Sequence, residues 1–450
     1  IVRTGDTLDV TTQITGSTAS ISQDELANTK AIKVLGPNYL TFTAQGETSS
    51  VTLNYGSGTD VQYKKYTKTS NKWGTWTTYP TAPTAGRSEK ISLASGDKVS
   101  FKGMNVQTNN KHFEMTGTIA ASGSVTSLTD GNGNDPNVTI GAKCYYGMFT
   151  GCGSLTTAPE LPAAKLATQC YAFMFSQCEN LTTAPELPAT DLAERCYADM
   201  FNLCKRLETA PALPATTLAP SCYDSMFQDC KKLKNMPELN AKKLEKACYR
   251  DMFLNCYSLQ TAGELPATEL AEDCYAGMFT TCSNLQHAPA LPVRELKPGC
   301  YSRMFKNCSK LTETPTLPAE SLAASCYKEM FSGCKGLTTV PELPATKLEK
   351  ECYAGMFSGC TGLSIKDTPD ETNGYTVAWS IPSSGTATFG EGATEESYSW
   401  NTNMFDGCSD VDLGTGSKKP QANVTYYQKG SNSGGETHTH AFNIEKANSE

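Results

Sequence analysis

The chain has 450 residues, of which 38% are hydrophobic and 19% charged, and its formal net charge is −8 at pH 7 with a pI near 5.3. A weakly acidic chain with so few charges lacks the basic surface that nucleic acids require, so we expect no nucleic-acid partner. No run reaches the roughly 18 consecutive apolar residues of a membrane-spanning helix, so we expect no transmembrane span in this chain.

The N-terminal part of the chain is expected to be rich in β-strands. The chain starts at Ile1, without an initiator methionine or a signal peptide, so we expect any signal or anchor segment to be absent from it. Residues 1–36 are mostly polar and are expected to be a linker or part of a preceding domain. In residues 37–104, alternating runs separated by Gly, Asn, Pro and Ser predict a small antiparallel β-sandwich. The six runs are YLTFTAQ, SVTLNY, VQYKKY, GTWTTY, KISLA and KVSFKG.

Residues 105–143 include the irregular segment TGTIAASGSVTSLTDGNGNDPNVTIGAK, which we expect to cap the structure that follows. From Cys144 the sequence repeats every 26 residues: CYYGMFTGCGSLTTAPELPAAKLATQ is followed by CYAFMFSQCENLTTAPELPATDLAER and seven more variants. Nine copies fill residues 144–363. Such a period indicates a solenoid, in which each copy buries its apolar face against its neighbours.

Each copy, numbered from its first cysteine as position 1, begins with apolar residues at positions 1, 2, 5, 6 and 9. This spacing predicts one apolar stripe on an α-helix of about two turns. Pro220 and Pro298 suit a first helical turn, and Gly or Asn at position 8 suits a left-handed C-terminal cap. The following L-x-x-A-P-x-L-P segment is extended, and its prolines limit a parallel ladder to two or three residues per copy. The predicted fold class is therefore an α/β solenoid of short helices and short parallel strands, preceded by an all-β domain.

Two columns of leucines are expected to point into the solenoid. Each buried leucine, methionine or phenylalanine contributes about 1.5 to 3 kcal/mol, so stacked copies need no covalent link. The first column is Leu155, Leu181, Leu207, Leu233, Leu259, Leu285, Leu311, Leu337 and Leu363, and the second is Leu166, Leu192, Leu218, Leu244, Leu270, Leu296, Leu322 and Leu348.

Eighteen of the 19 cysteines occupy positions 1 and 9 of the copies. On a helix these two cysteines lie about 10 Å apart, and neighbouring helices pack about 8 to 10 Å apart, whereas a disulfide needs Cα atoms within about 7 Å. In the degenerate copy SYSWNTNMFDGCSD, Trp400 replaces the first cysteine while Cys408 keeps the second. We favour buried thiols, with disulfides or a metal site as alternatives.

Residues 364–413 interrupt the period with an expected β-hairpin, after which the degenerate copy is expected to cap the stack. Residues 414–450 form a polar tail that we expect to be loosely held.

The repeats resemble the leucine-rich repeats of the Bacteroides surface protein A (BspA) type. The shared pattern is MF-x-x-C-x-x-L-x-x-A-P-x-L-P, which covers Cys144 to Leu363 and the copy at Trp400 to Cys408. A Cys-Tyr pair stands where that family usually has Ile-Gly. The resemblance implies an α/β leucine-rich-repeat solenoid in a secreted or surface-anchored protein of host-associated anaerobic bacteria. Some proteins of this type resemble adhesins for host matrix proteins or for other bacteria.

No catalytic pattern stands out in the sequence. The histidines, His112, His287, His438 and His440, do not follow the period, and no nucleophile-elbow, zinc-protease, phosphate-loop or dinucleotide motif occurs in its structural context. Eighteen equivalent cysteines indicate a structural role. We therefore expect no enzyme activity, cofactor or metal. The basic stretch Lys231 to Arg250 is a weak candidate for a binding patch.

A polar, weakly acidic face is expected between the inward leucines. It permits a protein partner, although threonines also simply suit short exposed strands. A tyrosine column from Tyr145 to Tyr353 is a second candidate, with rings packed between helices and hydroxyls reaching solvent. The candidate face is Thr156, Thr157, Glu160, Thr182, Thr183, Glu186, Glu208, Lys234, Asn235, Glu238, Gln260, Glu264, Gln286, His287, Glu313, Thr338 and Glu342.

The leading hypothesis is a non-enzymatic, monomeric, secreted or surface-anchored bacterial protein whose solenoid binds a host or bacterial surface protein. The alternative is a carbohydrate-binding component of a surface glycan-uptake system. Its contact set would be the aromatic residues of the sandwich, Tyr63, Tyr66, Trp73, Trp76 and Tyr79.

Overall fold

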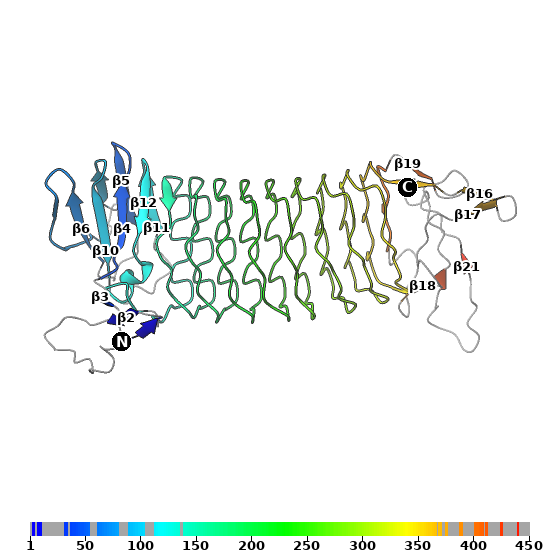
Figure 1. Ribbon diagram of the computed structural model, residues 1–450, viewed down its shortest axis with the longest axis horizontal. Coiled ribbons are helices and arrows are strands. Elements are labelled where there is room, and N and C mark those ends of the chain that lie inside the picture. The colour runs from blue at the N-terminus through cyan, green and yellow to red at the C-terminus, as the bar shows by residue number, and fades with distance from the viewer. Residues whose placement is uncertain are drawn as a thin grey trace.

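The computed structural model describes residues 2–4, 7–10, 31–34, 37–54, 61–80, 89–103, 112–135, 138–366, 368–370, 374–376, 387–389, 400–408, 410–412, 424–425 and 439–440. Within these residues the protein is an elongated stack of coils with a β-sandwich at its N-terminal end (Figure 1). It is rich in sheet, and the only helix in this part of the chain is a single 3₁₀ turn, η1 (Val125–Leu128). Most of the predicted linker 1–36 and tail 414–450 lies outside the described residues.

Two sheets form the sandwich, and all six predicted strand segments contain strands. One sheet has the order β13-β12-β4-β10-β6-β7, with β8 also paired to β6, and the other has the order β11-β5-β9. Phe42, Phe101 and Phe113 meet edge to face in the core between them. The strands are β4 (Leu40–Ala44), β5 (Ser49–Asn54), β6 (Gln62–Thr67), β7 (Lys72–Trp73), β8 (Thr77–Thr78), β9 (Lys90–Leu93), β10 (Lys98–Lys102), β11 (His112–Thr116), β12 (Ile119–Ser122) and β13 (Leu155–Thr157).

The sandwich continues into the coils without a break. Strands β11 and β12, which the sequence assigned to the cap, belong to the two sheets, and β12 pairs in parallel with β13 of the first copy. The Phe113 ring stacks on Phe149 at 5.4 Å, and the Phe113 N–H donates to the Met148 carbonyl. The sandwich therefore covers the end of the stack. A separate small sheet contains β1 (Val2–Thr4), β2 (Thr7–Val10) and β3 (Ala31–Val34).

The predicted two-turn helix is wrong: positions 1 to 9 form a run of consecutive turns. Alternate N–H groups bond locally, as Met148 N donates to Tyr145 O at 3.3 Å, and the others bond to the next coil, as Phe149 N donates to Met174 O at 2.9 Å. Every fourth residue has positive φ, at positions 26, 4 and 8, for example Ala247 (52°), Asp251 (50°) and Asn255 (61°). The sequence predicted only the left-handed residue at position 8.

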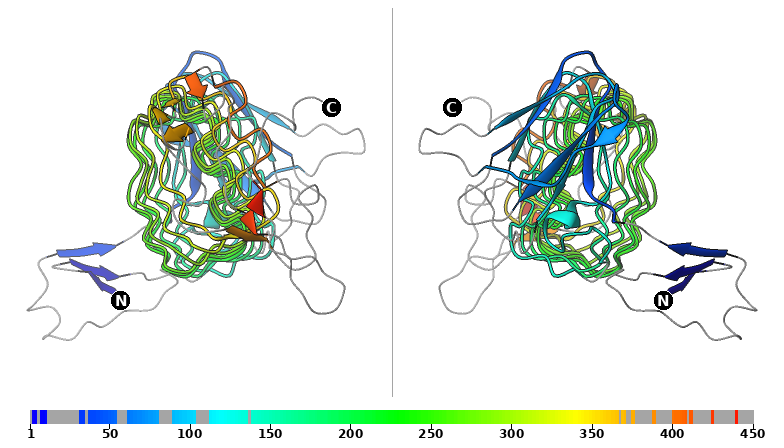
Figure 2. Two further views of the ribbon diagram at one scale, coloured as in Figure 1. Left: turned by 90° about the vertical axis from the view of Figure 1, so that its right-hand side faces the viewer. Right: turned by 90° about the vertical axis from the view of Figure 1, so that its left-hand side faces the viewer.

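The spacing between coils explains why turns replace the helix. On the opposite side of each coil, parallel bridges join equivalent residues, such as Thr183 to Thr209, which fixes neighbouring strands about 4.8 Å apart. Packed helices would need about 8 to 10 Å and would splay that side. The run of turns keeps both sides at a similar spacing, so the coils lie almost behind one another and the stack is nearly straight (Figure 2).

A change between glycine and a larger residue at position 4 should have opposite effects in a helix and in this run of turns. Gly355 has φ of +61°. In a helix Gly355→Ala would gain about 1 kcal/mol, whereas at positive φ we expect it to cost about 1 kcal/mol. The reverse change, Ser225→Gly at φ of 54°, should stabilise the protein. Urea unfolding measures both, and a more stable Gly355→Ala protein would contradict the run of turns.

The predicted leucine columns are confirmed. All nine leucines of the first column are fully buried, and those of the second are at most 9% exposed except Leu192, which is half-buried. A third column, Leu161 to Leu343, is also buried. At position 14, most parallel bridges join only one residue of each copy to its neighbour. The sequence predicted a ladder of two or three residues per copy.

The degenerate copy joins the stack as its last run of turns. Tyr353 N donates to Trp400 O and Phe357 N to Met404 O, and the Phe357 and Phe405 rings stack at 5.5 Å. Between the last regular copy and this one, β16 and β17 form an antiparallel pair, where the sequence predicted a hairpin. The strands of this region are β14 (Lys347–Leu348), β15 (Ser364–Lys366), β16 (Thr368–Asp370), β17 (Gly374–Thr376), β18 (Ala387–Phe389), β19 (Asp410–Asp412), β20 (Val424–Thr425) and β21 (Thr439–His440).

Candidate functional site

Both cysteine columns lie inside the stack as thiols. At position 9 each Sγ donates to a phenylalanine carbonyl, which belongs to Phe113 of β11 for Cys152 and to the preceding coil for the others, for example from Cys178 to Phe149 at 3.1 Å. Burial raises the pKa of the Cys196 and Cys274 thiols to about 12, so little reactive thiolate forms at neutral pH. The coils are closer than helices would be, so the predicted helix spacing no longer argues against disulfides between coils.

The tyrosine column is also internal, so the prediction that its hydroxyls reach solvent is wrong. Nine rings from Tyr145 to Tyr353 stack at 5.6 to 6.0 Å and are at most 2% exposed. The hydroxyls of Tyr171 and Tyr275 are buried without a hydrogen-bond partner. Dense ring stacking accounts for their position, because a turned ring would break two stacks at once. This column offers no binding surface.

The predicted polar face does form one side of the stack. Position 14 carries the parallel bridges, from Thr157 through Thr183 and Thr209 to His287, so its side chains recur at a regular interval along the stack. The face residues from Thr182 onward are exposed, whereas Thr156 and Thr157 are half-buried. The structure therefore brings the candidate residues together as a long, narrow, open surface.

Two kinds of contact restrain residues of this polar face: hydrogen bonds to the sandwich and an ion pair between coils. At its start, Glu160 accepts a hydrogen bond from Asn38 at 2.6 Å, and Thr156 donates to Gln45 at 3.0 Å, so the sandwich adjoins the face. Further along, Lys234 pairs with Glu208 of the preceding coil at 2.7 Å, which lowers the pKa of that carboxyl. The charges of Glu208 and Lys234 therefore offset each other in the middle of the face.

Neighbouring coils pair three of the seven basic residues in the stretch Lys231 to Arg250, which are Lys234, Lys246 and Arg250. Lys246 pairs with Glu272 at 2.8 Å, and Arg250 makes two hydrogen bonds to the nearly buried Asp224. Sequence reasoning missed this last pair, although the spacing of 26 residues between its members was the available signal. Such pairing between coils favours a structural role over a binding patch.

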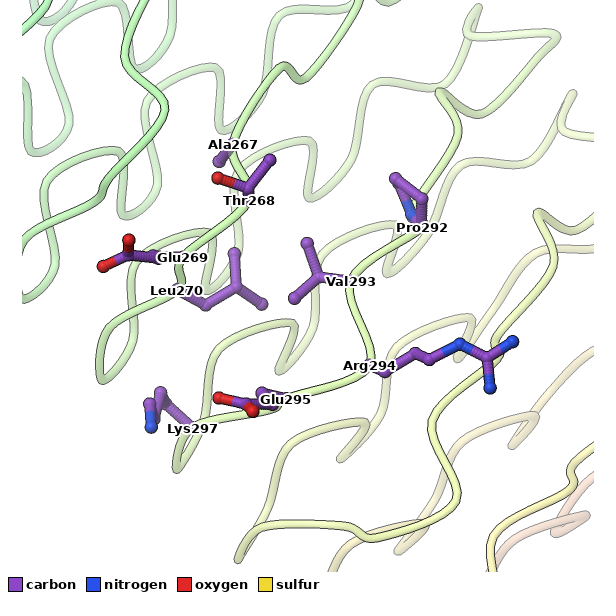
Figure 3. Close-up of a pocket in the computed structure, with 9 residues that line it drawn as sticks. All are labelled: Ala267, Thr268, Glu269, Leu270, Pro292, Val293, Arg294, Glu295 and Lys297. Atoms are coloured by element: carbon purple, nitrogen blue, oxygen red, sulfur yellow. The ribbon is translucent and has the colours of Figure 1, made fainter.

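One open groove lies between the coils that begin at Cys248 and Cys274. It has a volume of about 670 Å³, and in Figure 3 Leu270 and Val293 face each other across it. Val293 stands where the other copies have alanine, and its side chain lines the groove. Parallel bridging at position 22 joins Lys243 to Glu269, and the bridges among the described residues do not continue to Glu295. Its lining residues are Ala267, Thr268, Glu269, Leu270, Pro292, Val293, Arg294, Glu295 and Lys297.

The aromatic set of the sandwich divides between two sides of its sheet. Tyr79 is fully buried and Tyr63 packs against it at 5.7 Å, so neither is available as a platform. Tyr66 and Trp76 are half-buried and Trp73 is 43% exposed, on the outer side. Only three of the five predicted contact residues therefore share a surface.

The histidines are scattered. His112 begins β11, His287 lies on the polar face, His440 ends β21, and His438 lies outside the described residues. Within the described ranges, no group of three His, Cys, Asp or Glu side chains is arranged to hold a metal ion. The same residues include no helix long and apolar enough to cross a membrane. Comparisons of the chain with protein-family models, with curated proteins and with solved structures find no match.

Proposed function

We propose that this is a non-enzymatic, secreted or surface-anchored bacterial protein whose coil stack binds another protein. The observation that carries the proposal is the exposed face at positions 13 to 17, which is held by backbone bridges between coils. A rigid face loses little conformational freedom when a partner binds, which favours affinity. Solenoids commonly use such extended surfaces to bind partners.

The distribution of reactive groups also supports a binding role. The thiols and phenols that recur in every copy are buried, and the pKa values of many are raised by burial. The exposed positions instead carry Thr, Gln, Asn, Glu and Lys, which suit hydrogen bonding to a protein surface. We expect the partner to be a host or bacterial surface protein, and the chain itself to be a monomer.

The resemblance to BspA-type leucine-rich repeats is part of this proposal. The buried leucine columns and the parallel bridges agree with such repeats. The run of turns at positions 1 to 9 differs from the short helices that the α/β leucine-rich-repeat class would supply. Assignment to that family therefore rests on the repeat sequence and on the leucine side of the coils.

The test is binding of the full chain to an array of extracellular-matrix and bacterial surface proteins. Replacing Gln260 and Gln286 together by arginine changes the middle of the face, and we expect binding to weaken about tenfold or more. A control variant with arginine at Thr217 and Ser321 changes exposed residues on another side of the coils and should bind normally. Equal binding by both variants, or no protein bound, would refute the proposal.

A further inference from the structure

The outer side of the seven-stranded sheet combines lysines, aromatic rings and hydroxyls. Side chains alternate along a strand, so Lys98, Ser100 and Lys102 of β10 share one side, while Val99 and Phe101 are buried on the other. The strand register defines rows across this outer side. Lys98 lies opposite Thr43 and Tyr66, and Ser100 lies opposite Thr41 and Lys64.

Three lysines on this surface lie against aromatic rings. Lys64 Nζ lies 4.8 Å from the ring centroids of both Trp73 and Trp76, and Lys102 Nζ lies 4.6 Å from that of Trp76. Lys98 Nζ lies 5.8 Å from the Tyr66 ring. These contacts hold the ammonium groups in place without neutralising them.

None of the ion pairs among the described residues involves Lys64, Lys98 or Lys102. The carboxylate of the nearby Asp97 has other partners: it pairs with Lys65 at 3.2 Å and accepts hydrogen bonds from the Lys68 and Ala94 N–H groups. The result is a locally positive surface on a chain whose net charge is −8.

We propose that this outer sheet surface, formed by Lys64, Lys98, Lys102, Tyr66, Trp73 and Trp76, binds an acidic polysaccharide. Carboxylate or sulfate groups would pair with the ammonium groups, and the C–H faces of the sugars would stack on the exposed Trp73 ring. This surface adjoins the start of the polar face through β4, β12 and β13, but none of its six residues belongs to that face, so it adds a second binding activity to the proposed protein-binding function.

Charge and the exposed Trp73 ring favour an acidic polysaccharide as the occupant. Partial burial, together with the smaller effect of repulsion by Lys102, lowers the pKa of Lys64, and a bound anion would relieve that repulsion. Between the lysine rows, the hydroxyls of Thr41 and Ser100 hydrogen-bond each other at 2.7 Å, and Ser100 is only 2% exposed, so this pair supports the surface from below and leaves the ligand contacts to the lysines and the rings. A cationic ligand would be repelled by the lysines already placed over the rings.

The test measures binding of the full chain to polygalacturonate and chondroitin sulfate, with fully methyl-esterified polygalacturonate as the neutral control. We expect binding of the acidic polymers, little binding of the ester, and weakening with salt. Lys64→Gln with Lys102→Gln should weaken binding about tenfold or more, and so should Trp73→Ala, whose side chain is too exposed to be needed for folding.

The matched control replaces the exposed Lys231 and Lys232 of the coils by glutamine, with the same loss of charge, and should bind like the parent. Binding that survives the sandwich substitutions, or that falls equally in the control, would overturn the proposal. Binding only to poly(dT) or only to phosphatidylserine vesicles would also overturn it in favour of a nucleic acid or a membrane. Protein binding by the coils is read separately on the protein array, so the two proposals can fail independently.

Discussion

The protein should unfold cooperatively when the pH rises above about 9, well below the pH at which its lysines lose their charge. The cause is the buried thiols and phenols of the stack. Burial raises the pKa of Cys152 and Cys352 to about 12, and it raises those of Tyr171 and Tyr249 well above the usual value for tyrosine. In the unfolded chain a thiol ionises near pH 8.5 and a phenol near pH 10.

Each such group favours the folded state as long as it stays protonated in both states. Above the unfolded pKa the unfolded chain releases its proton while the folded chain keeps it, so the free energy of unfolding falls by about 1.4 kcal/mol per pH unit per group. About ten thiols would remove a typical stability of 5 to 15 kcal/mol within about one pH unit. The chain has 19 cysteines, all buried, so we expect a steep transition.

Urea unfolding at several pH values between 7 and 10.5, under reducing conditions, measures this slope, and thiolate absorbance reports ionisation. Replacing Cys204, Cys230 and Cys256 by alanine removes three position-9 thiols and should reduce the slope by about 4 kcal/mol per pH unit. Comparing slopes avoids the stability lost at neutral pH by the substitutions themselves. A pH-independent stability, or thiolate formation without unfolding, would contradict the expectation.

The leucine side of each coil could be predicted from the sequence, but the cysteine side could not. Leu181 and Pro185 specify a buried residue followed by a short extended segment, and the structure has both. At positions 1 to 9 the apolar spacing of Cys274, Tyr275 and Phe279 also fits a helix. What excludes the helix is the spacing imposed by bridges on the far side of the coil, a tertiary constraint that a single copy does not contain.

The candidate site was predictable for a similar reason. The polar face could be predicted because the residues between the inward-pointing leucines must point outward. These residues therefore share one side of the coils. Contacts between coils were harder to foresee, because Arg250 with Asp224 needs the coil register as well as the period. On the sandwich, alternation places Tyr66 on the outer side, but only the strand register shows that Lys64 and Lys98 adjoin its aromatic rings.

The second large effect concerns the phenylalanine column that runs through the stack. Phe253 is fully buried, and its ring stacks on Phe227 at 5.6 Å and on Phe279 at 5.8 Å. Phe253→Ala removes both stacks and leaves a cavity that the bridged coils cannot close, so we expect the free energy of unfolding to fall by about 3 to 5 kcal/mol. The matched control is Phe173→Ala, a half-buried ring outside the column, which should cost much less.

A double-mutant cycle then tests whether the column acts as a continuous stack. Phe253→Ala and Phe279→Ala each remove the ring contact that they share, so the double variant should lose about 0.5 to 1.5 kcal/mol less than the sum of the two. Phe175→Ala and Phe331→Ala are separated by several coils, so their effects should add. Denaturant unfolding with a constant m-value supplies all the free energies. Additive losses for the neighbouring pair would show that each ring is stabilised by its own coil and that stacking between coils contributes little.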